Sequence, residues 1–160
     1  MEKKIQIFTD GACSGNPGKG GYGIVMQFGN IKKELSAAYK HTTNNRMELL
    51  AVIIALQSIR DKNYTIDLYS DSKYVCDSIN KGWLNGWIKK GFKDKKNPDL
   101  WKNCYAILQT LKVNFIWVKG HNGHPMNERC DQLAVAATQN GPWQIDAAYE
   151  NLKSNNTPLL

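Results

Sequence analysis

The sequence has no hydrophobic run long enough to cross a membrane. Its longest unbroken apolar stretch is Leu49–Leu56, well short of the ~20 residues that span a bilayer. The first residues lack the apolar stretch of a secretory signal peptide, and the four cysteines are widely spaced without a C-x-x-C pair. These absences argue against a membrane-spanning helix and a disulfide scaffold. We therefore expect reduced thiols and a cytoplasmic location.

Acidic residues are few compared with basic ones. The 160 residues include 21 Lys and Arg but only 14 Asp and Glu, which gives a formal net charge of +7 at pH 7. The 42% of hydrophobic residues is typical of a globular chain, and the length suits one domain. The excess of positive charge favours a polyanionic partner.

Hydrophobic periodicity predicts a mixed α/β domain. Short alternating segments predict strands at Lys4–Thr9, Tyr22–Phe28, Ile31–Tyr39, Thr65–Ser70 and Asn114–Val118. Longer segments predict helices at Arg46–Arg60, Ser72–Ile79, Asp99–Leu111 and Asn127–Gln139. Short links between the first three strands indicate an antiparallel meander within a five-stranded mixed sheet flanked by helices. We expect residues 1–142 to form the domain and 143–160 to form a peripheral or mobile tail.

Four carboxylates have structural explanations that are adequate singly but less convincing together. Asp10 and Asp71 each follow an expected strand, where a turn residue and a helix N-cap are the ordinary interpretations. Glu48 falls on an apolar helix face, although a capping box with Asn45 would also explain it. Asp131 lies early in the last helix, where negative charge is favourable.

In an α/β arrangement these four positions can meet at one edge of the sheet. A cluster of carboxylates repels itself without cations, and hard oxygen ligands suit Mg²⁺ or Mn²⁺. Two such ions ~3.5–4 Å apart are the usual device for in-line phosphodiester cleavage. The pattern therefore indicates a divalent-metal site for phosphoryl chemistry.

Two further features leave alternatives open. His121 and His124 lie in a glycine-containing loop, either as solvated residues or as an imidazole that moves protons beside the acids. The segment Lys81–Lys102 carries seven lysines and two acids, and Trp83 and Trp87 are interleaved with them. It is either a solvated charged surface with inward aromatics or a binding surface for a nucleic-acid backbone.

Four segments together form a specific pattern. They are Phe8–Gly18 (FTDGACSGNPG), Thr42–Leu49 (TTNNRMEL), Ser70–Val75 (SDSKYV) and Val118–Asp131 (VKGHNGHPMNERCD). In order and spacing, from residue 3 to about 142, the chain resembles type 1 ribonuclease H, most closely the bacterial stand-alone branch, ribonuclease HI. The resemblance implies a five-stranded mixed sheet in which strands 4 and 5 run parallel to strand 1.

The resemblance also implies a reaction. It is endonucleolytic hydrolysis of the RNA strand of RNA·DNA hybrids by a two-metal-ion mechanism, with little sequence preference and with 3′-hydroxyl and 5′-phosphate ends. The implied cofactors are two Mg²⁺ ions, with Mn²⁺ as a substitute. The implied partner is the hybrid duplex, with neither a membrane nor an obligate protein partner, so we expect a monomer.

The site residues that follow from the resemblance are these. The metal-binding and catalytic carboxylates are Asp10, Glu48, Asp71 and Asp131, and the catalytic loop histidine is His121 and not His124. The substrate-binding positions are Cys13, Asn16, Thr43, Asn44, Asn45, Lys73, Trp83, Trp87, Lys89 and Lys90. The last four belong to a basic protrusion, at about residues 81–98, in which the tryptophans face the DNA strand.

The chain departs from the family at His41, where many relatives carry arginine, and at Lys73, where a neutral amide is common. A neutral histidine holds phosphate more weakly than a guanidinium, whereas Lys73 adds an ionic contact. We expect no separate hybrid-binding module before the domain, and for that reason we do not expect processivity. Three other functions are alternatives: a DNA-strand transferase or junction resolvase, a non-catalytic hybrid- or double-stranded-RNA-binding module, and a domain severed from a reverse transcriptase.

Overall fold

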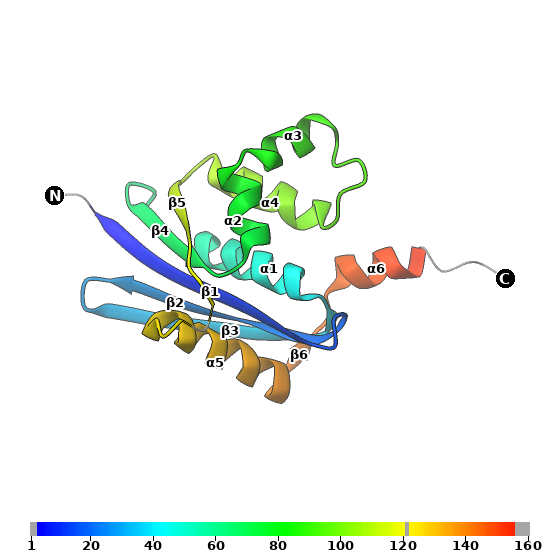
Figure 1. Cartoon of the computed structure of the whole chain (residues 1–160), viewed down its shortest axis with the longest axis horizontal. Coiled ribbons are helices and arrows are strands. Elements are labelled where there is room, and N and C mark those ends of the chain that lie inside the picture. The colour runs from blue at the N-terminus through cyan, green and yellow to red at the C-terminus, as the bar shows by residue number, and fades with distance from the viewer. Residues whose placement is uncertain (1–2, 121, 156–160) are drawn as a thin grey trace.

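A mixed sheet runs through the part of the chain that the computed structural model describes, residues 3–120 and 122–155 (Figure 1). Its strands are β1 (Lys4–Ser14), β2 (Gly18–Phe28), β3 (Ile31–Thr42), β4 (Thr65–Ser70), β5 (Lys112–Trp117) and β6 (Trp143–Gln144). Across the sheet they are ordered β5-β4-β1-β2-β3-β6. The first three strands form an antiparallel meander, and β4 and β5 continue it in parallel with β1, which confirms the predicted fold class.

Helices cover both faces of this sheet (Figure 1). They are α1 (Asn44–Gln57), α2 (Lys73–Asn80), α3 (Trp83–Lys89), α4 (Pro98–Leu108), α5 (Pro125–Asn140) and α6 (Ala147–Asn155). The unbroken apolar segment of α1 is buried nearly all round because the helix lies between the sheet and α4. On the opposite face, α5 packs against β1 and β2.

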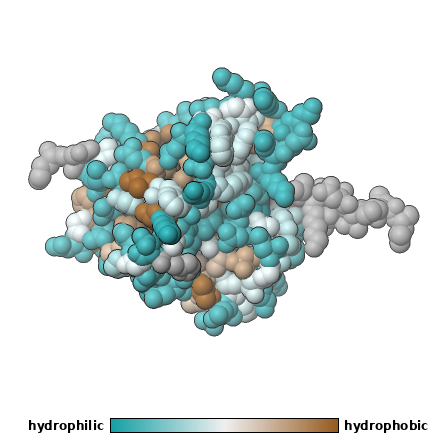
Figure 2. All heavy atoms as spheres, viewed as in Figure 1, coloured by the Kyte–Doolittle hydropathy of each residue, from teal (hydrophilic) through white to brown (hydrophobic). Residues whose placement is uncertain are grey.

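The alternation of β1 and β2 divides the core in two. Ile7 and Ile24 belong to the larger hydrophobic cluster on the α1 side, whereas the adjacent Phe8 and Val25 pack with Cys130 on the α5 side. Successive side chains of a strand point to opposite faces, so each strand supplies both clusters. The surface view in Figure 2 is largely hydrophilic with scattered hydrophobic residues. Among the described residues, no helix is both long and apolar enough to cross a membrane.

The glycine-rich segment between β1 and β2 corrects a predicted boundary. Residues 10–21 (DGACSGNPGKGG) are turn-forming residue types and predict a turn throughout, but this prediction is wrong because β1 continues to Ser14 and β2 already begins at Gly18. Several glycines of β1 and β2 allow neighbouring elements to pack closely against these strands. A Cβ on Gly23 would lie 2.2 Å from the backbone oxygen of Cys130 in α5, so only glycine allows this helix to approach the strand.

The segment after Pro142 adds a sixth strand that the sequence did not predict. Trp143 and Gln144 pair in parallel with Ala38 and Tyr39 at the edge of the sheet. Asp146 follows as a buried residue, with 8% of its surface exposed, and α6 continues beyond it. The first residues of the expected tail are therefore packed against the domain, although they lie at its edge.

Candidate active site

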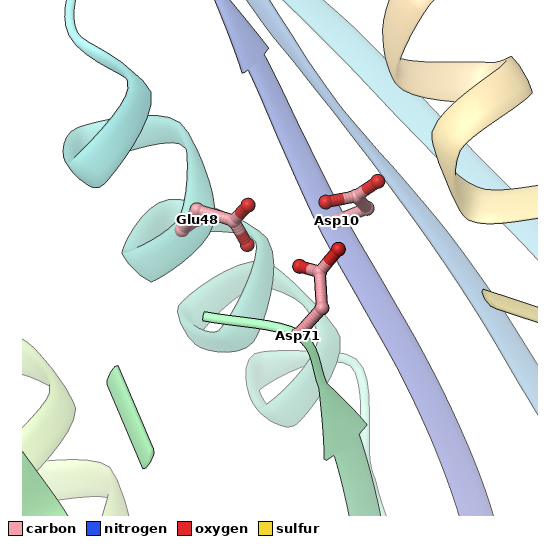
Figure 3. A group of neighbouring side chains, drawn as sticks. All are labelled: Asp10, Glu48 and Asp71. Carbon is pink, nitrogen blue, oxygen red and sulfur yellow. The ribbon is translucent and has the colours of Figure 1, made fainter. Parts of the chain in front are cut away.

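Three of the four candidate carboxylates meet at one point (Figure 3). Asp10 comes from β1, Glu48 from the second turn of α1, and Asp71 directly follows β4. One oxygen atom of each carboxylate lies within 4.8 Å of the others. We call these three residues the acid triad. Their oxygens are the kind of donor that divalent cations prefer, so the acid triad fits a metal ion.

The backbone brings these residues together. β1 and β4 are parallel neighbours with Thr9 opposite Ser70, so Asp10 and Asp71 emerge at adjacent strand positions. Gly11 allows α1 to approach β1, because a Cβ there would lie 2.6 Å from the amide nitrogen of Glu48. Close contact between the backbones of β1 and α1 therefore places Glu48 beside Asp10.

Burial and the repulsion between carboxylates raise the pKa values of two members of the acid triad, Asp10 and Glu48. Burial, followed by the negative charge of Asp71, raises the pKa of Asp10 to about 8. Burial also raises the pKa of Glu48 well above its ordinary value, and the charges of Asp10 and Asp71 add to the effect. Among the described residues, Glu48 Oε2 is buried without a hydrogen-bond partner. A cation would supply the missing partner and offset the repulsion.

Asp131 of α5 lies farther out. It lines the same open hollow of about 410 Å³ as the acid triad, but it is not part of the tight group. Its negative charge is the last and smallest of the influences that raise the pKa of Asp10. The structure therefore places Asp131 at the rim of the hollow.

The candidate substrate-binding residues form two sets around this hollow. Asn44, Asn45 and Lys73 line it together with the carboxylates. The side-chain oxygen of Asn16 accepts a hydrogen bond from the backbone N–H of Asn44 at 3.0 Å, so the β1–β2 turn is tied to α1. Thr43 caps α1 by accepting from the backbone N–H of Arg46, and Cys13 Sγ lies 3.5 Å from the carbonyl oxygen of Thr42.

The basic segment forms a second site on α3 and the loop that follows. Trp83, Trp87, Lys90, Lys93 and Lys95 line a pocket of about 610 Å³, which we call the tryptophan pocket. Trp83 is 45% exposed, whereas the ring of Trp87 packs edge-on against buried Trp101 with 5.7 Å between the ring centres. Lys89 ends α3 and is exposed. Both alternatives for this segment are therefore partly realised, since one tryptophan faces solvent and the other reaches the core.

The two histidines differ. His121 lies outside the described residues. His124 caps α5, where its Nδ1 accepts from the backbone N–H of Asn127 at 3.4 Å, and its ring packs 5.2 Å from that of Phe8. His124 therefore has a structural task at the start of α5.

The sequence pattern did not predict a role for Arg46. Its guanidinium is buried and donates to Asp146 through Nε at 2.7 Å and to Asp99 through Nη2 at 2.7 Å. These contacts join α1 to the start of α4 and to the chain after β6. The only signal in the sequence was an arginine two residues before Glu48, and the partners are far away in the chain.

Carboxylates grouped where two parallel strands stop pairing, beside amides and a basic surface, are typical of metal-dependent enzymes that act on phosphodiesters. Residues 2–139 match the family model of RNase H. The ribonuclease H of Desulforamulus reducens is 51% identical over 149 residues, covering 90% of this chain and 93% of that protein.

Two solved structures are also similar. LC9-RNase H1, described as a type 1 RNase H with the type 2 active-site motif, superposes with a TM-score of 0.78 and 26% identity, covering 96% of this chain and 82% of the other. LC11-RNase H1, solved in complex with an RNA/DNA hybrid, gives a TM-score of 0.62 and 25% identity, covering 84% and 96%. The chain belongs to the RNase H family, and it is a ribonuclease H enzyme.

Proposed function

We propose that this enzyme is an endonuclease that hydrolyses the RNA strand of RNA·DNA hybrids with little sequence preference, leaving 3′-hydroxyl and 5′-phosphate ends. The observation that carries the proposal is the close grouping of the acid triad, which opens into a hollow shared with Asn44 and Asn45. The complex of LC11-RNase H1 with a hybrid supports this choice of substrate. We propose that the enzyme acts as a monomer.

The proposed cofactor is a pair of Mg²⁺ ions, for which Mn²⁺ would substitute. Asp10, Glu48 and Asp71 would hold them, with Asp131 at the rim as a further ligand. When bound, such ions supply an activated water and electrostatic stabilisation of the leaving 3′-oxygen. The chain itself holds the three carboxylates close together, and it leaves Glu48 Oε2 buried without a hydrogen-bond partner among the described residues.

The surrounding residues select and hold the substrate. Asparagine amides at Asn16, Asn44 and Asn45 suit the 2′-hydroxyls that only the RNA strand carries in the wide, shallow minor groove. Cys13 and Thr43 flank them, and Lys73 adds positive charge beside the acids. Contacts of this kind reach sugar and phosphate more than base edges, which explains the expected lack of sequence preference. From its sequence motif, His121 is proposed to assist proton transfer.

The test uses one labelled RNA strand, presented as single strand, RNA duplex and RNA·DNA hybrid, each with Mg²⁺ or with EDTA. We expect cleavage of the hybrid alone, lost in EDTA. Asp10→Asn should lower turnover by at least about a hundredfold, as expected when charge stabilisation in the transition state is lost, while hybrid binding persists. Unchanged turnover of Asp10→Asn would refute the role of the acid triad, and preferential cleavage of duplex DNA would favour a strand transferase or resolvase.

A further inference from the structure

Three hollows lie next to one another along the surface, because neighbouring hollows share a lining residue. Asn45 lines both the acid hollow and a groove of about 510 Å³. Lys95 lines both this groove and the tryptophan pocket. We call it the middle groove, and its wall includes Asn16, Thr43, Asn45, Lys95, Ala148 and Tyr149. The three hollows therefore follow one another from the carboxylates to the basic segment.

One side of the middle groove is made by α6, beyond the β6 edge strand. Tyr149 packs between two residues of the domain, with 5.4 Å between its ring centre and that of His41 and 5.7 Å to the guanidinium carbon of Arg46. Asp146 anchors the start of this helix, since it accepts hydrogen bonds from Arg46 Nε at 2.7 Å and from Thr42 Oγ1 at 2.8 Å. The wall is therefore held by buried charge and ring contacts.

The chemistry of the middle groove suits a sugar–phosphate backbone. Amides at Asn16 and Asn45 offer hydrogen bonds, and the exposed Lys95 and Lys96 supply positive charge. Arg46 is paired with two carboxylates, Asp99 and Asp146, which leaves one negative charge in excess, so Lys95 and Lys96 supply the attraction for phosphate and outweigh that charge. Tyr149 lines the groove and is half-buried, so the exposed part of its ring can contact a sugar or a base.

We propose that α6 is part of the substrate-binding surface, and that Ala148 and Tyr149 wall a groove which holds the sugar–phosphate backbone of the DNA strand. This rests on the proposed function, because the RNA strand must lie at the acid triad to be cleaved. The complementary strand then crosses toward the lysines and tryptophans, and the middle groove lies on that path. The segment after β6 thereby gains a role in binding the hybrid.

The test places charge on one exposed helical position and compares it with its neighbour. Ala148 lines the middle groove, whereas Ala147 is equally exposed on the same helix and does not line it. Hybrid affinity would be measured by fluorescence anisotropy in EDTA, where no cleavage occurs, at about 0.15 M salt so that charges act over only ~8 Å. We expect Ala148→Glu to weaken binding about fivefold and Ala148→Lys to strengthen it by a similar factor. The matching Ala147 variants should stay within about twofold of the parent protein.

A separate experiment tests whether the DNA strand of the hybrid is the one that lies in the middle groove. A hybrid whose DNA strand carries uncharged methylphosphonate linkages should abolish the opposite effects of the two Ala148 variants. If the effects persist with a neutral DNA strand, the groove faces the RNA strand and the proposal is overturned. It is also overturned if the Ala147 and Ala148 variants behave alike.

The aromatic wall is tested in steady-state cleavage. Tyr149→Ala should raise KM about five- to tenfold with kcat unchanged, and Tyr149→Phe should restore KM because the ring remains. An unchanged KM in Tyr149→Ala, or a loss confined to kcat, would contradict the proposal. Binding in EDTA is independent of turnover, so a failure of the parent protein to cleave hybrids would count against the proposed function alone.

Discussion

Asp10 and Glu48 are buried beside the half-buried Asp71, although like charges repel and burial disfavours ionised groups. Such an arrangement costs stability, and its presence between two well-packed core clusters indicates that function determines it. Asp71 has an additional backbone constraint, because the indole N–H of Trp117 donates to its carbonyl oxygen at 3.0 Å. The surrounding fold therefore holds together three carboxylates that repel one another.

Without divalent ions, the burial and repulsion of these carboxylates should make the free energy of unfolding depend on pH. The pKa of Asp10 is raised from 3.8 to about 8, so the folded protein keeps a proton that the unfolded chain releases. Stability therefore falls as pH rises from about 4 to about 8, where the folded state binds more protons. In EDTA at pH 8, Asp10→Asn should be more stable than the parent protein by about 2 kcal/mol, and the difference should shrink toward pH 4. Urea unfolding at both pH values measures it.

Two controls accompany this measurement. Asp61→Asn removes an exposed carboxylate between α1 and β4, and it should change stability equally little at both pH values. Mg²⁺ at pH 8 should stabilise the parent protein more than Asp10→Asn, because bound cations offset the repulsion. A stability difference that is the same at pH 4 and pH 8 would contradict the link between burial, repulsion and protonation.

At the scale of elements, the sequence predicted those strands and helices whose own residues determine them. Alternating residues such as Ile5 and Ile7 indicated β1, and the apolar segment Leu49–Leu56 indicated a buried α1. The meeting of Asp10 with Asp71 followed from the rule that parallel strands end at a common edge. These features depend on local pattern and on general topology, so a single sequence was sufficient to predict them.

The remaining elements depend on tertiary contacts that leave little local pattern. β6 is only two residues long and exists because Trp143 meets Ala38 across the sheet. The contact of Arg46 with Asp146 joins residues one hundred positions apart. No periodicity or spacing predicts such a pair, and Asp146 looks like an ordinary polar residue of a tail. The sequence therefore did not predict the structure of the segment after Pro142, because an ion pair between residues far apart in the chain holds it.

The unequal burial of the two partners of Arg46 predicts unequal effects. The side chain of Asp146 is 9% exposed and that of Asp99 is 39% exposed, although both contact the same guanidinium. Asp146→Asn should lower the free energy of unfolding by about 3 kcal/mol, since it leaves a buried charge less well compensated. Asp99→Asn should cost about 1 kcal/mol or less, because water replaces an exposed partner.

Urea unfolding of the two variants side by side checks this prediction, with the isosteric amide as the same change in each. Asp146→Asn should also weaken hybrid binding through the loosened α6, whereas the stability loss of Asp99→Asn is too small to release that helix. Equal losses of stability in the two variants would mean that the ion pair with Asp146 does not hold the segment after β6.

Across the whole molecule, positive charge is concentrated on one side. The segment Lys81–Lys102 has a net charge of +5 within a chain whose total is +7. Hydrophilic side chains dominate this part of the surface, around α3 and the loop after it (Figure 2). A one-sided field orients a polyanion before contact, and binding to phosphates releases counterions, so affinity should depend steeply on salt.

Two matched double substitutions can show whether the salt dependence of hybrid affinity arises from the side of the molecule that carries Lys81–Lys102. Lys89→Ala/Lys90→Ala removes two exposed lysines at the end of α3, and Lys32→Ala/Lys33→Ala removes two from the exposed start of β3, which faces no proposed substrate surface. The logarithm of the hybrid association constant, plotted against the logarithm of KCl concentration, should lose about two units of slope in the first variant, since each phosphate contact contributes ~0.9. The second variant has the same net charge and should keep the slope of the parent protein. Because net charge is matched, a loss of slope in both variants would mean that the total charge governs association, whereas a loss confined to the first means that the α3 side contacts the phosphates.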